Sequence, residues 1–135
     1  MNFIDKAIAN KENMSADDFL QAMADIYSEP DVWNILNNYP QYIQDIVYII
    51  DYDTEIQMEG LESFVIYKEE QHEKIITAML NVGITQEAEL LNKAIKLDFE
   101  SDYEDKLEAI SERIALNNDY DSFWDLVRKY IERNK

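Results

Sequence analysis

The chain has 135 residues, of which 47% are hydrophobic, and its 29 aspartates and glutamates against 12 lysines and arginines give a formal net charge of −17. This length fits a single domain over residues 1–135, and so many apolar and aromatic side chains exclude a disordered acidic tail. The absence of cysteine excludes disulfides and thiolate metal sites, while the negative charge argues against direct binding to nucleic acid or to an anionic membrane.

Apolar residues recur at helical spacing along almost the whole chain, and only two glycines and two prolines interrupt the pattern. A short helix is predicted from Phe3 to Ile8, and a second is predicted to follow Ser15, whose hydroxyl would cap it. Pro40 is predicted to open the longest helix, which would run to about Gln57. The expected apolar face of that helix consists of Ile43, Ile46, Val47, Ile49, Ile50 and Ile56.

The second half of the chain shows the same periodicity, broken at two glycines. A short apolar helix is expected after Gly60, and Gly83 is expected to end a helix over residues 71–82 in a left-handed conformation. Thr85 is expected to cap the next helix. Ser101 is predicted to start a helix that runs through Leu116, and Asp119 or Asp121 is predicted to start the last one. The predicted fold is all-α, a single compact bundle of about six to nine helices.

No membrane or export segment is expected. The N-terminus lacks a basic stretch followed by an apolar one, and the longest apolar run, residues 46–50, is far shorter than a membrane span. We therefore expect a cytoplasmic protein.

The charges are distributed unevenly along the chain. From Glu12 to Tyr67 there are twelve carboxylates and no lysine or arginine, so this segment carries −12 of the net charge of −17. Because like charges repel and destabilise a compact protein, such a concentration favours a role in binding a positively charged partner.

Two acidic patches are predicted within that segment. Four carboxylates three or four residues apart would form one stripe if the long helix continues: Asp51, Glu55, Glu59 and Glu62. The second patch consists of Asp17, Asp18, Asp25, Glu29 and Asp31. Carboxylates in a row resemble the phosphates of duplex DNA, so we expect these residues to pair with lysines and arginines of a DNA-binding protein. The alternative is that they simply face solvent.

Two other titratable residues have structural expectations. Asp53 lies on the apolar face of the long helix, so it is expected to be partly buried and to cap a neighbouring helix. His72, the only histidine, is expected at the surface, because Glu69-x-x-His72 lacks the second copy that a di-iron site requires.

No catalytic, cofactor-binding or metal-binding residue is predicted, and we expect a protein that is not an enzyme. Two alternatives remain open. An immunity-type inhibitor would use the same acidic surface to block a basic nuclease toxin. A magnesium-dependent nucleotide pyrophosphohydrolase would use two acidic pairs, Glu70 with Glu73 and Asp102 with Asp105.

The stretch from Asp53 to Phe64, DTEIQMEGLESF, resembles the signature of a family of small acidic bacterial all-helical proteins named for a DNA-mimic protein. Residues 78–84 and the alanine-rich helix after them resemble the next element of that family. The resemblance covers about residues 35–97, with Glu59-Gly60 where the family has two glycines. It implies a homodimer that blocks the DNA-binding surface of a transcription regulator. The expected partner is therefore a basic protein, either such a regulator or a nuclease.

Overall fold

Helices make up all the regular structure of residues 2–135, the part of the chain that the computed structural model describes. This confirms the predicted all-α class, and the seven α-helices in these residues fall within the predicted range. The α-helices are α1 (Phe3–Asn10), α2 (Ala16–Met23), α3 (Gln41–Tyr67), α4 (His72–Val82), α5 (Thr85–Ile95), α6 (Tyr103–Ser111) and α7 (Tyr120–Arg133). Short 3-10 turns are η1 (Lys11–Asn13), η2 (Ala24–Tyr27), η3 (Pro30–Asn34), η4 (Leu36–Asn38), η5 (Glu69–Gln71) and η6 (Ala115–Asn117).

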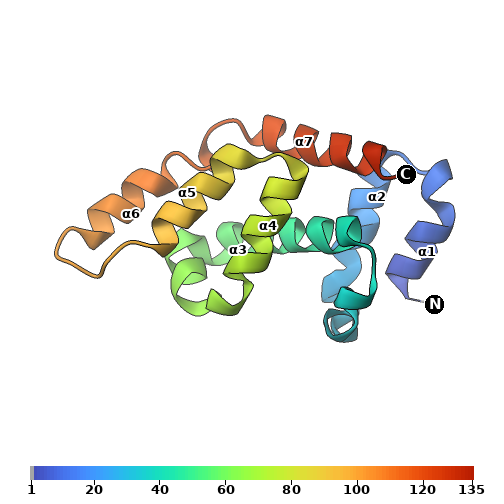
Figure 1. The fold of residues 1–135 in the computed structure, drawn as a ribbon, viewed down its shortest axis with the longest axis horizontal. Coiled ribbons are helices and arrows are strands. Elements are labelled where there is room, and N and C mark those ends of the chain that lie inside the picture. The colour runs from blue at the N-terminus through green and yellow to red at the C-terminus, as the bar shows by residue number, and fades with distance from the viewer. Residues whose placement is uncertain (1) are drawn as a thin grey trace.

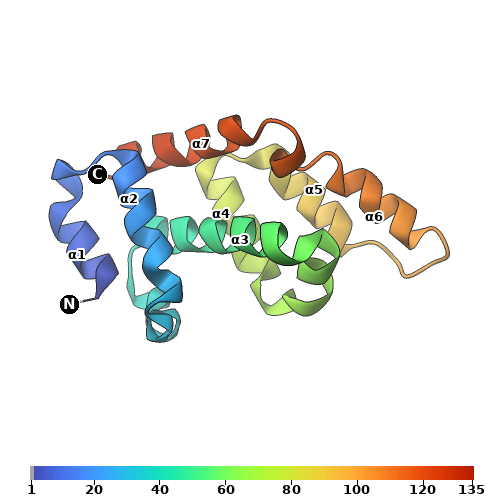
Figure 2. The same cartoon turned by 180° about the vertical axis from the view of Figure 1, so that it is seen from behind.

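The helix α3 forms the centre of the molecule. Every residue from Asp45 to Tyr52 is buried, on all sides of the helix, so neighbouring helices must surround it. In Figure 1, α3 runs through the middle with α4 and α5 beside it and α7 along the top. Figure 2 shows α2 crossing α3 on the opposite side. The core side chains form one continuous cluster that draws on all seven helices.

Gly60 bends α3 near its end. Its φ of 87° and ψ of 167° lie in a region that only glycine adopts readily, so the last part of α3 turns away from the first. The predicted break at Gly60 and the apolar segment after it are thus confirmed. The predicted end near Gln57 is short by two residues, because helical geometry continues to Glu59, the residue before the glycine.

Most predicted helix boundaries agree with the structure. Ser15 caps α2 by accepting the Asp18 N–H at 3.1 Å, Asp119 caps α7 by accepting the Ser122 N–H, and Gly83 ends α4 with φ 97°. Thr85 is the first residue of α5 rather than its cap, because Ile84 holds the N-cap position.

The helix predicted from residue 101 to 116 is shorter than expected. Residues 101 and 102 form a turn, closed by the Tyr103 N–H on the Glu100 carbonyl, so α6 begins at Tyr103, and it ends at Ser111. The chain then becomes extended at Ile114, which is buried, before the short turn η6. Burial of this one isoleucine favours the extended conformation over a continued helix.

The two ends of the molecule differ in what they contain. One end holds α6 and the loop before it, and the other holds α1 with both chain termini (Figure 1). At that second end, Arg128 in α7 pairs with Asp17 in α2 at 2.6 Å, so an exposed ion pair joins these two helices. None of the helices in residues 2–135 combines the length and apolarity needed to cross a membrane.

Candidate protein-interaction surface

The predicted acidic stripe on α3 is interrupted at its first member. Asp51 is 4% exposed and accepts a hydrogen bond from the Tyr27 hydroxyl at 2.8 Å, so it cannot contact a partner. The prediction that Asp51 belongs to an exposed stripe is therefore wrong. The reason is that this section of α3 is buried on every side, so a spacing of four residues does not keep a carboxylate in solvent.

The other three carboxylates of the predicted stripe become more exposed toward the end of the helix. Glu55 is partly buried, and the Lys68 ammonium lies 3.6 Å from its carboxylate. Glu59 and Glu62 are exposed, but the Gly60 bend lies between them. The structure therefore leaves only these last two carboxylates as an accessible pair.

Tyrosine hydroxyls hold the carboxylates that lie inside. Tyr130 donates to Asp45 at 2.6 Å, and Tyr52 donates to Glu87 at 2.7 Å. Asp53 accepts from Tyr120, the first residue of α7. Its partial burial was predicted correctly, but its partner is this side chain rather than the backbone of a helix end. Burial raises the pKa of Asp53, and it also raises the pKa values of Asp51 and Glu87.

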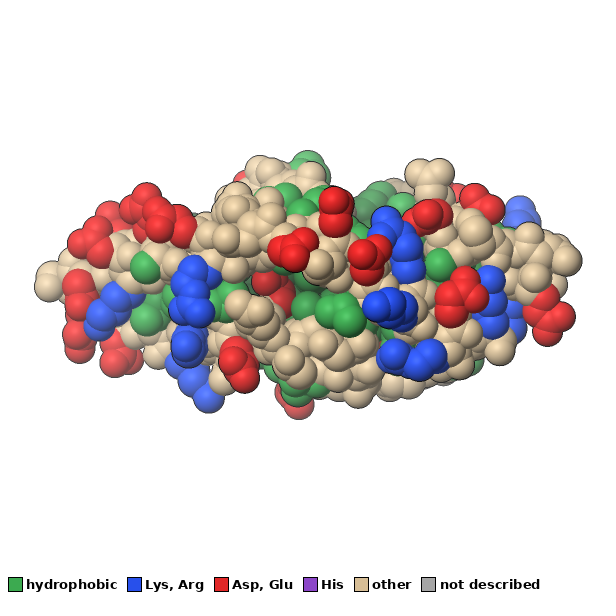
Figure 3. All heavy atoms as spheres, turned by 90° about the horizontal axis from the view of Figure 1, so that it is seen from above, with side chains coloured by type: hydrophobic (Ala, Val, Ile, Leu, Met, Phe, Trp, Pro, Cys, Tyr) green, Lys and Arg blue, Asp and Glu red, His purple; other side chains and the backbone are tan. Residues whose placement is uncertain are grey.

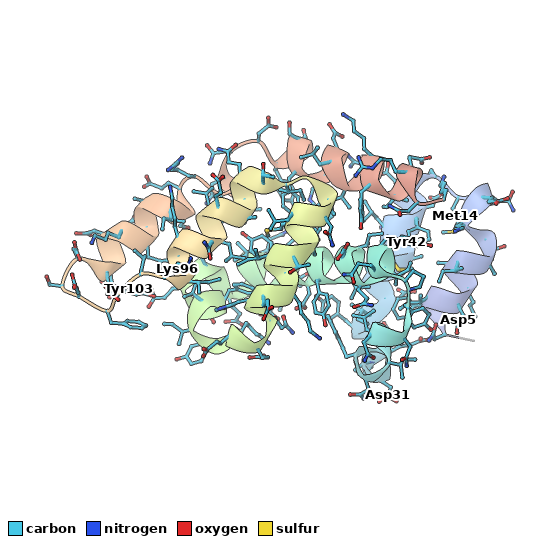
Figure 4. All side chains as sticks on the ribbon, viewed as in Figure 1. Asp5, Met14, Asp31, Tyr42, Lys96 and Tyr103 are labelled. Carbon is cyan, nitrogen blue, oxygen red and sulfur yellow. The ribbon has the colours of Figure 1, made fainter. Side chains whose placement is uncertain are left out.

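The second predicted patch is exposed but spread out. Asp17, Asp18, Asp25, Glu29 and Asp31 all face solvent. Asp17 is already paired with Arg128, and Glu29 accepts the Phe3 N–H at 3.2 Å. The five residues follow α2 and the turns after it from one edge of the molecule to the other, and Asp31 projects at the lower edge in Figure 4. They share one end of the molecule without forming a single cluster.

The densest group of exposed carboxylates was not predicted. It surrounds α6, where seven exposed carboxylates fall within fifteen residues that contain one base, Lys106. Together with Glu59 and Glu62 they form what we call the α6 acidic end. Its members are Glu59, Glu62, Asp98, Glu100, Asp102, Glu104, Asp105, Glu108 and Glu112. In Figure 3 carboxylates gather at this end, bordered by a band of lysine and arginine side chains.

The two parts of the α6 acidic end meet across a hollow of about 460 Å³ between α3 and α6. We call this the Gly60 hollow. It is lined by Glu59, Gly60, Leu61, Glu62, Glu104, Leu107, Glu108 and Ser111. The proximity of Glu59 and Glu62 to α6 could not be predicted from the charges of residues 12–67 alone, since α6 is distant in the sequence and begins only at Tyr103. A count of carboxylates over residues 98–112 would have drawn attention to α6.

A comparison with known protein families decides the relationship. Residues 37–134, nearly three quarters of the chain, match the DMP19-like protein family. The chain belongs to that family. The match begins within η4 and includes α3 to α7, so it extends well past the resemblance seen over residues 35–97 and covers the whole α6 acidic end. No curated protein and no solved structure matches the chain.

The geometry of this DMP19-like chain gives little support to a metal-dependent enzyme. Within residues 2–135 no three histidine or acidic side chains come together in a way that could hold a metal ion. The four carboxylates that a pyrophosphohydrolase would need, Glu70, Glu73, Asp102 and Asp105, are thus not assembled into a metal site. His72 is buried rather than exposed as expected, because its Nε2 lies 3.1 Å from the Phe64 carbonyl and its ring packs on the Phe64 ring.

Proposed function

We propose that this DMP19-like chain is a non-enzymatic cytoplasmic protein that binds the basic nucleic-acid-binding surface of a partner protein in place of DNA. The observation that carries the proposal is the α6 acidic end, where nine exposed carboxylates from α3, α6 and the residues flanking α6 share one end of the molecule. Among them, only Asp102 takes part in an ion pair within residues 2–135, with Lys106.

Unpaired carboxylates at this density cost stability, so they favour a role that uses the charge. Duplex DNA carries about one charge per 1.7 Å of its axis, so nine carboxylates correspond to roughly 15 Å of duplex. A lysine- and arginine-rich groove shaped for DNA would find a similar amount of charge here. Association would be steered by long-range attraction and would weaken steeply as salt rises.

Family membership also supports binding to a partner protein in place of DNA. The resemblance noted in the sequence implies a protein that occupies the DNA-binding surface of a regulator. The region matched to the DMP19-like family contains the α6 acidic end, whereas α1 and α2 lie outside it. The region matched to the family is therefore the part of the chain on which the proposal depends.

The test is capture of partners from the cell's own lysate on immobilised protein at low salt, with and without competing duplex DNA. We expect a DNA-binding protein that elutes with salt and is displaced by the duplex. A captured nuclease would instead support the immunity-type alternative. A captured protein that ignores the duplex, or an empty eluate, would contradict the proposal.

Two matched variants locate the surface in the same experiment. Reversing Glu62, Glu104 and Glu108 to lysine changes the net charge by +6, and so does reversing Asp18, Asp25 and Asp31. We expect the first variant to lose capture and the second to retain most of it. Equal losses would show that total charge, rather than the α6 acidic end, determines binding.

A further inference from the structure

Asp51 differs from the other buried carboxylates in how its oxygens are satisfied. Both oxygens of Asp45 accept hydrogen bonds, and so do both oxygens of Glu87. In Asp51, Oδ1 accepts the Tyr27 hydroxyl at 2.8 Å, while Oδ2 is buried and has no hydrogen-bond partner within residues 2–135. A buried carboxylate oxygen that lacks a hydrogen bond is costly, above all when the group is charged. The surroundings of Asp51 therefore favour a protonated carboxyl.

Tyr27, which covers Asp51, also differs from the tyrosines that bond the other two carboxylates. It is 48% exposed, whereas Tyr130 is 9% exposed and Tyr52 is 3% exposed. The neighbouring Ile26 is fully buried, so the backbone of η2 is anchored in the core while the Tyr27 ring lies at the surface. Exposed side chains change rotamer quickly and without disturbing the core. The Tyr27 ring can therefore leave Asp51 without unfolding of the turn that carries it.

Three side chains in the described part of the chain act on the charge of Asp51. Burial raises the pKa of Asp51, and the hydrogen bond from Tyr27 opposes that shift. Glu55, one turn farther along α3, raises this pKa by its negative charge, and Lys68 lowers it. The Lys68 ammonium lies 3.6 Å from the Glu55 carboxylate. Burial also raises the pKa of Tyr27, so the phenol stays protonated and Asp51 is the group that ionises.

The covered carboxyl binds its proton more tightly than a carboxyl in water does. Below about pH 4, the usual pKa of an aspartate, Asp51 is protonated whether or not Tyr27 covers it, and the covered arrangement is fully favoured. As pH rises from there to the higher pKa of the covered carboxyl, the ratio of covered to uncovered molecules falls. The ratio changes about tenfold for each unit between the two pKa values. Once the ring has moved, both oxygens of Asp51 can bond to water.

We propose that the Tyr27 side chain is a gate over Asp51, closed while the carboxyl is protonated and rotated into solvent when the carboxyl ionises. An open gate adds a charged carboxylate to the surface of α3, one turn before Glu55. The acidic stripe expected from the sequence would then begin at Asp51 only after the gate has opened. The gate is independent of the proposed function, because neither Tyr27 nor Asp51 belongs to the α6 acidic end.

The test is an NMR titration of the full chain, labelled with ¹³C at the aspartate carboxyl carbons and in the tyrosine rings, from pH 4.5 to 7.5. The carboxyl shift reports ionisation of Asp51, and relaxation by a neutral gadolinium chelate in the solvent reports exposure of the Tyr27 ring. We expect both signals to change with one midpoint, while the rings of Tyr52 and Tyr130 keep their low exposure. An Asp51 already ionised at pH 4.5, or ionisation with no change in Tyr27 exposure, would overturn the proposal.

Two variants separate the ionisation of Asp51 from general effects of pH. In D51N the side chain keeps its shape and cannot ionise, so we expect the exposure of Tyr27 to stay constant over the whole titration. In Y27A the cover is absent, so Asp51 should titrate near its usual pKa of about 4. A Tyr27 ring that still responds to pH in D51N, or an Asp51 pKa that stays raised in Y27A, would refute the gate.

The charged neighbours of Asp51 should shift the midpoint in opposite directions. E55Q removes a negative charge that raises the pKa of Asp51, so the midpoint should move to lower pH. K68Q removes a positive charge that lowers this pKa, so the midpoint should move to higher pH. E59Q is the matched control, because it removes the same charge as E55Q from an exposed position one turn farther along α3. Equal shifts in E55Q and E59Q would contradict the local arrangement on which the gate depends.

Discussion

Carboxylates inside this protein and carboxylates at its α6 acidic end are held in opposite ways. The buried Asp45, Asp51 and Glu87 and the partly buried Asp53 each accept a hydrogen bond from a tyrosine hydroxyl on another part of the chain. At the α6 acidic end, nine carboxylates face solvent and eight of them have no ion-pair partner among the described residues. The first group links helices to one another, and the second remains in solvent. A net charge of −17 therefore combines two populations of carboxylates in different surroundings.

The largest effect is expected from D45A. Asp45 is 1% exposed and accepts hydrogen bonds from Tyr130, Asn81 and Gln41. Its removal leaves the buried Tyr130 hydroxyl without an acceptor, whereas the amides of Asn81 and Gln41 are exposed and can bond to water. We expect the free energy of unfolding to fall by about 3 kcal/mol, measured by urea denaturation at pH 7. Y130F, which removes one donor and leaves the carboxylate two partners, should cost about 1 kcal/mol. If D45A lowered the free energy of unfolding by less than about 1 kcal/mol, the tyrosine-bonded carboxylates would not differ from the exposed ones in their effect on stability.

A smaller loss is expected from E87Q. Glu87 accepts the Tyr52 hydroxyl with one oxygen and the Ala115 N–H with the other, at 2.7 and 2.9 Å. Glutamine keeps the shape but can accept only one of these bonds, so we expect a loss of about 1–2 kcal/mol in the same measurement. E89Q, an exposed position on the same helix, is the control. Equal stability of the two variants would show that the Glu87 bonds contribute nothing net.

The pH dependence of stability should also distinguish buried carboxylates from exposed ones. Burial raises the pKa of Asp51, so the folded protein keeps this proton at pH values where the unfolded chain has released it. The free energy of unfolding should therefore decrease as pH rises from about 4, the pKa in an unfolded chain, through the higher folded pKa. In D51N this part of the decrease is lost, whereas the exposed substitution E69Q should leave the slope nearly unchanged. Urea midpoints from pH 4.5 to 7.5 provide the measurement, and identical slopes for D51N and the parent protein would contradict it.

The smallest effect is expected at the α6 acidic end. E62Q and E108Q each remove an exposed carboxylate that has no partner, so stability should rise slightly, by less than about 0.5 kcal/mol. Thermal unfolding at low salt gives the most sensitive measurement, because salt screens the repulsion that the substitution relieves. A clear destabilisation would mean that these residues belong to the structural group.

Local patterns in the sequence were enough to predict the helices but not the surface. The capping role of Ser15, the left-handed Gly83 and the break at Gly60 all depend on near neighbours in the chain, and each was predicted correctly. Exposure is different, because it depends on which helices pack where. Periodicity put Asp51 on the same stripe as Glu59, but the turn that carries Tyr27 covers it in the fold.

The α6 acidic end was missed for a related reason. Residues 12–67 stand out in the sequence because they contain no base, whereas in residues 98–112 Lys106 interrupts the carboxylates. That lysine is paired with Asp102, one turn away on the same stretch of chain, and offsets only one charge. The proximity of α3 and α6 across the hollow depends on the bend at Gly60 and on the path of the intervening helices. Short sequence patterns do not predict that path.

The position of the chain ends has a practical consequence. Both termini lie beside α1, where Lys135 reaches the Met14 carbonyl, and the α6 acidic end is at the far end of the molecule (Figure 1). An affinity tag, a fluorophore or a surface linker attached to either terminus would therefore hold the protein with its most acidic end pointing outward. Orientation on a sensor chip follows from the fold itself, and the same placement would keep a fused reporter domain out of the way of an approaching partner.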